Sequence, residues 1–114
     1  MSVNKIILLG YVGNDPEMRY PERDFAVARF SLATSEPKGA SGVEITDWHM
    51  CILTGRNASV AERYVRKGTR VYLEGKLRYR EYEDRYKIKR RVAEVEVIYM
   101  ELVGQPAATS SENH

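Results

Sequence analysis

The sequence contains little of what disulfide scaffolds, metal clusters and membrane spans require. Its 114 residues include one cysteine, Cys51, so neither an intramolecular disulfide nor a thiolate zinc cluster is expected. With only two histidines, His49 and His114, a two-histidine metal motif at helical spacing is excluded. The longest aliphatic run is far shorter than the roughly 18 residues of a membrane span, and the N-terminus lacks a secretory signal pattern. We therefore expect one cytosolic domain with no membrane association, no metal and no cofactor.

No constellation of catalytic residues is visible either. Gly10 and Gly13 fit neither a dinucleotide fingerprint nor a phosphate-binding loop, and their spacing indicates a bend in a strand. Cys51 lies within a predicted strand with no base beside it, which is typical of a small buried hydrophobic residue. The sequence therefore predicts a protein that is not an enzyme.

Positive charge is concentrated in the middle of a chain whose net charge is only +2. Residues 56–91 hold thirteen Lys or Arg and five Asp or Glu, whereas both flanking segments are net acidic. Such an asymmetry is typical of a surface that binds a polyanion. A solvated basic hairpin with no binding role fits the charge distribution equally well.

Apolar periodicity predicts five strands and one helix. The strands are expected at 3–12, 25–34, 45–55, 69–82 and 86–103, with a turn at 14–16 and a flexible loop at 36–42. Helical spacing covers 57–68, where Asn57 or Ser59 can cap the first turn and Ser59 with Glu62 fits a capping box. This order predicts an all-β fold, a five-stranded OB-fold Greek-key barrel with one short helix between strands three and four. The OB-fold domain is expected over 1–104, followed by a short disordered tail over 105–114.

Aromatic residues alternate with cations on the last two predicted strands. Tyr82 falls on the outward side near the hairpin tip, close to Arg78 and Arg80, where packing partners are scarce. Tyr79 and Tyr99 fall on the apolar side and are expected in the core. Flat rings beside a basic groove bind single-stranded nucleic acid with little sequence preference, because every base has a π-face and every nucleotide a charge. We therefore predict base stacking for Tyr82.

The strand expected at 45–55 is apolar on both faces. Trp48, Met50 and Ile52 alternate with His49 and Cys51. One face should pack in the core and the other should contact a partner or a ligand rather than water. Periodicity alone does not decide which face carries the tryptophan.

Several motifs, in the same order, resemble those of the bacterial single-stranded DNA-binding protein family. They are VNKIILLG at 3–10, GNDPEMRY at 13–20, LATSE at 32–36, DWH at 47–49, YVRKGTRVYLEG at 64–75 and LRYR at 77–80. The resemblance implies an OB fold assembled as a homo-oligomer, a homotetramer, with single-stranded DNA wrapped around it. It also implies sequence-tolerant binding and protection of that DNA in replication, recombination and repair.

The resemblance implies roles for individual residues. Trp48 falls on a tryptophan that stacks on bases, and Tyr82 falls on another stacking aromatic position. His49 and Tyr72 fall on positions associated with subunit contacts. The cations that match or lie near phosphate-contacting positions are Lys5, Arg56, Lys67, Arg78 and Arg80.

Three departures from the family pattern carry consequences. Lys38 stands where better-studied members have a stacking tryptophan, and Thr54 stands where they have a phenylalanine. Because base stacking contributes roughly 1–3 kcal/mol per base, weaker affinity per subunit or a smaller site is expected, partly offset by Lys38 as a phosphate contact. Family tails usually end in an acidic tip that recruits replication and repair proteins. Residues 110–114 hold one acid and no such ending, which makes that recruitment doubtful.

Two further hypotheses remain open from the sequence. The chain fits an OB module directed at RNA, or a primosome-type relative, as well as one directed at DNA. It also fits a structural OB protein that presents its basic hairpin to an acidic protein partner.

Overall fold

A computed structural model describes residues 1–105 and contains six strands and one α-helix. The strands are β1 (Ile6–Val12), β2 (Glu17–Glu22), β3 (Phe25–Lys38), β4 (Val43–Thr54), β5 (Arg70–Glu83) and β6 (Lys89–Gly104), and the helix is α1 (Gly55–Tyr64). The prediction of an all-β fold with its helix between the third and fourth predicted strands is confirmed. The sixth strand, β2, was not predicted, because its sequence EMRYPE is polar, contains a proline and pairs only with β3. Residues 106–114 of the tail predicted at 105–114 lie outside the described residues.

Strand β1 closes the sheet on itself. It pairs antiparallel with β5 from Ile6 to Tyr11, and its last two residues also pair with β3. Because β5 pairs with β6, β6 with β4 and β4 with β3, the order returns to β1. Strands β1 and β3 approach so closely that a Cβ at Gly10 would lie 2.1 Å from the carbonyl oxygen of Ala33. Glycine at this position therefore allows the closure that an OB fold requires.

The core fills the interior of this closed sheet and the contact with α1. It consists of Val12, Ala26, Ala28, Phe30, Leu32, Cys51, Leu53, Ala58, Ala61, Val65, Val71, Leu73, Val95 and Val97. On β3, the even-numbered residues from 26 to 32 point inward. Burial raises the pKa of the Cys51 thiol to about 12, so this cysteine is a core side chain, as predicted, and not a nucleophile at neutral pH.

Helix α1 begins and ends earlier than predicted. Thr54 stays in extended conformation and the chain turns at Gly55, which has φ +58, so helical residues start there. The predicted caps are therefore wrong: Asn57 lies inside the helix and its side chain donates a hydrogen bond to the carbonyl oxygen of Ile98. After Tyr64 the chain becomes extended and forms a separate turn. Within residues 1–105 no helix is long and apolar enough to cross a membrane.

An irregularity in β6 reverses which side chains face outward. Gly75 pairs with Val97 but Glu74 pairs with Tyr99, so Ile98 is an extra residue in β6. Such a β-bulge shifts the alternation by one position. Tyr99 is consequently 48% exposed, and its predicted place in the core is wrong.

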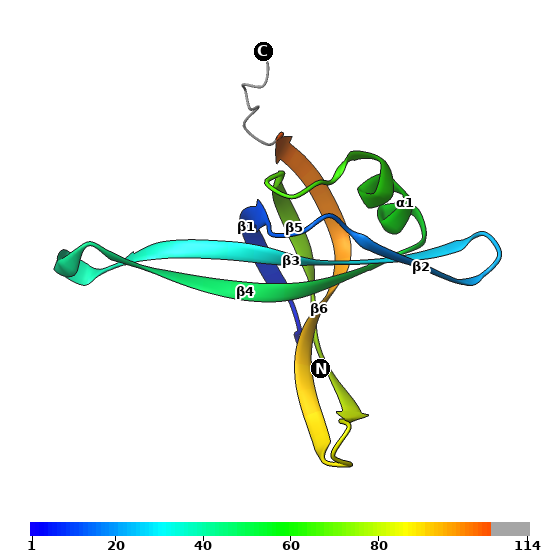
Figure 1. The fold of residues 1–114 in the computed structure, drawn as a ribbon. Coiled ribbons are helices and arrows are strands. Elements are labelled where there is room, and N and C mark those ends of the chain that lie inside the picture. The colour runs from blue at the N-terminus through cyan, green and yellow to red at the C-terminus, as the bar shows by residue number, and fades with distance from the viewer. Residues whose placement is uncertain (106–114) are drawn as a thin grey trace.

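Three hairpins extend beyond the closed sheet as arms: β2–β3, β3–β4 and β5–β6 (Figure 1). The loop predicted at 36–42 is shorter in the structure, since β3 continues to Lys38, a 3₁₀ turn covers Gly39–Ser41 and β4 begins at Val43. Tyr79, also predicted in the core, is 57% exposed because at that point β5 has left the core and entered its arm. The radius of gyration is 16.0 Å, whereas a compact chain of this length is expected near ~13 Å. The arms account for this extension and offer long exposed surfaces.

Candidate nucleic-acid interface

Trp48 is the most prominent aromatic side chain on the outward face of β4. The strand directs Cys51 into the core, so Trp48, Met50 and Ile52 point the other way. Trp48 therefore lies on the face of β4 that points away from the core, which periodicity alone did not decide. The indole is 63% exposed, and its six-membered ring lies against the backbone of Gly13, where a Cβ would be 2.4 Å from Cζ3.

Replacing Gly13 with alanine should displace the Trp48 ring. The added methyl group overlaps ring atoms and lies 2.7 Å from Oγ of Ser31. The exposed indole and the serine hydroxyl can both move aside, so the expected loss of stability is about 1 kcal/mol, at the low end of overpacking. Because Trp48 is the only tryptophan, its emission spectrum should shift and report the displacement directly. Gly104→Ala is a matched control, since a Cβ there meets only an ordinary contact at 3.5 Å. An unchanged emission spectrum in Gly13→Ala would contradict the packing.

Two adjoining cavities, of about 250 and 460 Å³, form a groove on the outward face of β2, β3, β4 and the neighbouring β5–β6 arm. We call it the arginine groove; it is lined by Asn14, Glu17, Arg19, Val27, Arg29, Phe30, Met50, Ile52, Arg80 and Glu94. Trp48 lies at one end, because Met50 is two residues along the same face of β4 and Asn14 follows Gly13. An exposed ring and three arginines therefore share one surface.

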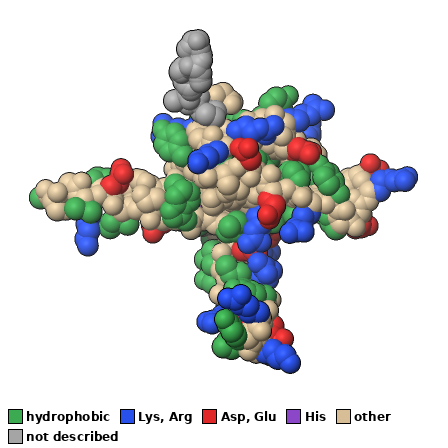
Figure 2. All heavy atoms as spheres, viewed as in Figure 1, with side chains coloured by type: hydrophobic (Ala, Val, Ile, Leu, Met, Phe, Trp, Pro, Cys, Tyr) green, Lys and Arg blue, Asp and Glu red, His purple; other side chains and the backbone are tan. Residues whose placement is uncertain are grey.

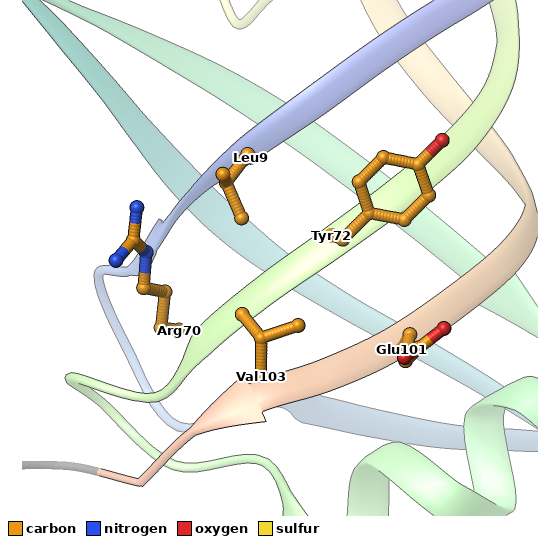
Figure 3. A pocket seen from close by; sticks show the side chains of 5 residues that line it. All are labelled: Leu9, Arg70, Tyr72, Glu101 and Val103. Carbon is orange, nitrogen blue, oxygen red and sulfur yellow. The ribbon is translucent and has the colours of Figure 1, made fainter.

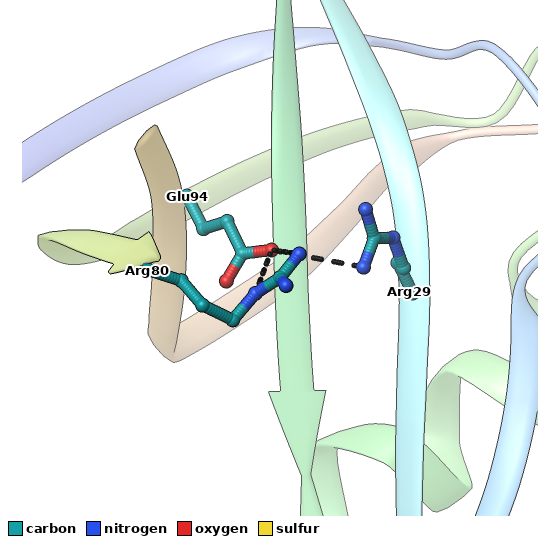
Figure 4. Close-up of polar contacts among 3 residues, drawn as sticks. All are labelled: Arg29, Arg80 and Glu94. Atoms are coloured by element: carbon teal, nitrogen blue, oxygen red, sulfur yellow. Dashed lines mark hydrogen bonds and ion pairs between the residues drawn. The ribbon is translucent and has the colours of Figure 1, made fainter. Parts of the chain in front are cut away.

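A buried carboxylate lies between two of these arginines (Figure 4). The Oε2 atom of Glu94 accepts hydrogen bonds from Nη2 of Arg80 at 2.9 Å and from Nε at 3.2 Å. Nη1 of Arg29 lies 3.6 Å from the same oxygen, which makes an ion pair. The hydrogen bonds to Glu94 raise the pKa of Arg80 above its ordinary value.

Two predicted phosphate-binding cations thus already have acidic partners. Arg80 is bonded to Glu94, and Nε of Arg78 donates to Oε1 of Glu96 at 2.9 Å. A phosphate approaching either arginine would meet a carboxylate as well as a guanidinium. Their role in DNA binding stays a prediction, and the structure adds that their charge is partly neutralised.

The other predicted cations lie outside the arginine groove. Arg56 is in the first turn of α1, Lys67 is in the turn that follows α1, and Lys38 ends β3 near the tip of its arm. All three side chains are exposed, and among residues 1–105 none forms an ion pair. Lys5 also lies elsewhere, paired with Glu74 at 3.4 Å.

Asp84 organises the tip of the β5–β6 arm. Its Oδ1 accepts hydrogen bonds from the backbone N–H groups of Ile88 at 3.0 Å and Tyr86 at 2.8 Å, and its Oδ2 accepts one from Nε of Arg90 at 2.9 Å. These bonds, led by that from Ile88, lower the pKa of the Asp84 carboxyl below its ordinary value. The tip is therefore a defined turn that remains ordered at neutral pH.

The β5–β6 arm combines aromatic rings with guanidinium groups, and Figure 2 shows Lys and Arg side chains along it and at its tip. Tyr82 is exposed, as the alternation predicted; its stacking role stays a prediction. Three rings have a guanidinium near their centroid: Tyr82 with Arg80 at 5.6 Å, Tyr86 with Arg85 at 5.1 Å and Tyr79 with Arg91 at 4.5 Å. Rings and cations presented together are what base stacking and phosphate contact require.

The outward face of β1, β5 and β6 carries a second surface. Leu9, Arg70, Tyr72, Glu101 and Val103 surround a cavity of about 470 Å³ on it (Figure 3). The hydroxyl of Tyr72 donates to Glu74, the carboxylate that also pairs with Lys5. This surface combines aliphatic side chains with tyrosine–glutamate pairs and differs from the arginine groove.

His49, the other predicted subunit-contact residue, lies on a different element from Tyr72. It is half-buried on β4, on the same side as Cys51, and its Nε2 is 2.9 Å from Oγ1 of Thr34. The structure of one chain does not bring His49 and Tyr72 together, and the subunit roles of both stay predictions. Across the described part of the chain, no group of three or more His, Cys, Asp or Glu is arranged to hold a metal ion.

Sequence reasoning missed two arginines of the groove, Arg19 and Arg29. Arg19 lies on the unpredicted strand β2. Arg29 carried a signal, because it is the one charged residue in the alternating segment 25–34 and lies on the side opposite Phe30.

Comparisons with known proteins agree with this architecture. Residues 3–103 match the sequence model of the family described as "Single-strand binding protein family". A single-stranded DNA-binding protein of Bacteroides thetaiotaomicron is 41% identical over 96% of this chain, which spans 71% of that relative. One of Neisseria meningitidis serogroup A is 39% identical over 91% of the chain, which spans 62% of that relative. The structure of a Plasmodium falciparum SSB complex with ssDNA has a TM-score of 0.79 at 32% identity, covering 92% of this chain and 96% of that one.

Proposed function

The chain belongs to the single-strand binding protein family, and on this basis we propose that it binds and protects single-stranded DNA without catalysing a reaction. The observation that carries the proposal is the exposed indole of Trp48 at the end of a groove that holds three arginines. Stacking and phosphate contact are largely independent of base identity, so binding tolerates any sequence. We place this activity in 1–104 as one domain, in the cytoplasm on the nucleoid, where it supports replication, recombination and repair.

The surface favours one path for the DNA strand. A base stacks on Trp48, and the backbone then follows the arginine groove past Arg29 to Arg80. Beyond the groove the strand reaches the β5–β6 arm, where Tyr82 stacks on a second base. Lys38, on the β3–β4 arm, contacts phosphate where the family usually has a ring.

We also propose that the chain assembles as a homotetramer through the second surface. Leu9 and Val103 are exposed there, next to Tyr72, although aliphatic side chains gain free energy from burial. Strand β1 pairs with β5 along one edge, whereas on its other edge only its last two residues pair, with β3. An exposed apolar face beside an incompletely paired strand fits a second copy of the chain, and His49 supplies a further contact on β4.

A fluorescence titration with poly-dT at two salt concentrations, beside light scattering for mass, tests both proposals. Trp48 emission should be quenched, and the affinity should fall with salt with a logarithmic slope of about −0.7 per phosphate neutralised. The mass should correspond to four chains. Absence of quenching would reject the DNA interface, whereas a monomer mass would reject only the assembly. Stronger competition by RNA than by DNA of the same length would assign the site to RNA.

A further inference from the structure

Glu94 is an unusual residue for a face that is proposed to bind an anion. It is 8% exposed, and a buried carboxylate is costly unless it is paired and hydrogen-bonded. Arg29 is in register with Ile52 of β4, and Ile52 is in register with Glu96 of β6, so Glu94, two residues before Glu96, reaches Arg29 diagonally across β4. Glu94 and Arg29 therefore meet across the outward face of β4.

The geometry leaves both guanidiniums able to bind a further anion. All three contacts use one oxygen of Glu94, its Oε2. Arg29, at 3.6 Å, forms an ion pair without a hydrogen bond, so its five N–H donors remain available on that side. The side chains of Arg29 and Arg80 are 37% and 46% exposed. Each guanidinium therefore keeps N–H donors that Glu94 does not use.

Charge determines how strongly such a phosphate is held. Five charged side chains line the cavity of about 250 Å³, and their net charge is +1: Glu17, Arg19, Arg29, Arg80 and Glu94. Neutralising the one buried carboxylate would raise that charge to +2. Because Glu94 is shielded from solvent, its charge is screened less than that of a surface acid.

We infer that Arg29 and Arg80 form a phosphate subsite and that Glu94 is a positioning residue which holds them together and limits the affinity for DNA. This inference rests on the proposed function. Glu94 orients two guanidiniums that would otherwise repel each other, and its charge opposes the bound phosphate. The protein thereby keeps an ordered subsite from which a strand is released readily.

The test compares Glu94→Gln with the unaltered chain in dT-oligomer titrations from 50 mM to 1 M salt. One additional uncompensated cation should steepen the logarithmic salt slope by about 0.7, which gives about eightfold tighter binding at 50 mM and about threefold at 200 mM if the gain vanishes at 1 M. Arg29→Gln should make the slope shallower by about 0.7. The double variant restores the original net charge and should return the slope to its starting value.

Glu62→Gln is the matched control, because it removes the same charge from α1, where Glu62 accepts a hydrogen bond from Tyr20 outside the arginine groove. Equal tightening by Glu62→Gln would reduce the effect to net charge and overturn the inference. Unchanged binding by Glu94→Gln would also overturn it. If Glu94→Gln does not fold, Arg29→Gln decides, since an unchanged slope rejects the subsite. Failure of the unaltered chain to bind dT would instead reject the proposed function.

Discussion

Trp48→Ala should weaken binding of a dT oligomer by roughly 5- to 150-fold, the equivalent of about 1–3 kcal/mol for one lost base stack. The indole is the largest exposed ring at the arginine groove, and it lies against the backbone of Gly13. An aromatic side chain with two rotatable bonds provides a large contact area and loses little conformational entropy on binding. Tyr82→Ala should act in the same direction but less strongly, because its ring is smaller and lies on the protruding β5–β6 arm.

Anisotropy of a labelled oligomer is the suitable measurement, since Trp48→Ala removes the intrinsic fluorophore. Tyr64→Ala is the control, because Tyr64 is an exposed ring at the end of α1 that lines neither cavity of the groove. Its binding should match that of the unaltered chain. Undiminished affinity in both Trp48→Ala and Tyr82→Ala would reject the assigned stacking positions.

Phe30→Ala should lower the free energy of unfolding by about 3–5 kcal/mol, because the substitution leaves a large cavity in the core. Phe30 is 1% exposed and is the largest fully buried side chain. Phe25→Ala, on the same strand, is the control. Its side chain is 39% exposed near the tip of the β2–β3 arm and should cost much less.

Urea denaturation at one fixed protein concentration measures both variants, since assembly contributes to apparent stability. Similar losses in the two variants would contradict the assigned core. A loss confined to Phe30→Ala would support the inward alternation of β3, on which the outward position of Arg29 also depends.

Local patterns were sufficient for the fold class and for the exposed position of Tyr82 among neighbouring cations. Residues 25–34 alternate strictly, and a two-residue period places Phe30 inside and Arg29 outside wherever the strand is packed. Helical spacing predicted α1 to within four residues at its C-terminus. The interleaving of tyrosines and cations near the last hairpin predicted an exposed basic arm, because local composition reflects exposure to solvent.

Tyr99 and Glu94 mark the point where local patterns fail. The bulge at Ile98 inverts the face of Tyr99, and nothing in the surrounding residues announces an extra residue, since a bulge arises from how two strands twist together. Likewise, Arg29 and Glu94 are 65 positions apart and meet only because β3 and β6 flank β4 on its two sides. Composition and periodicity specify what each strand can bury, because burial depends on a residue and its near neighbours. The partner of a buried charge depends on which strands the closed sheet makes adjacent, and that is a property of the whole chain.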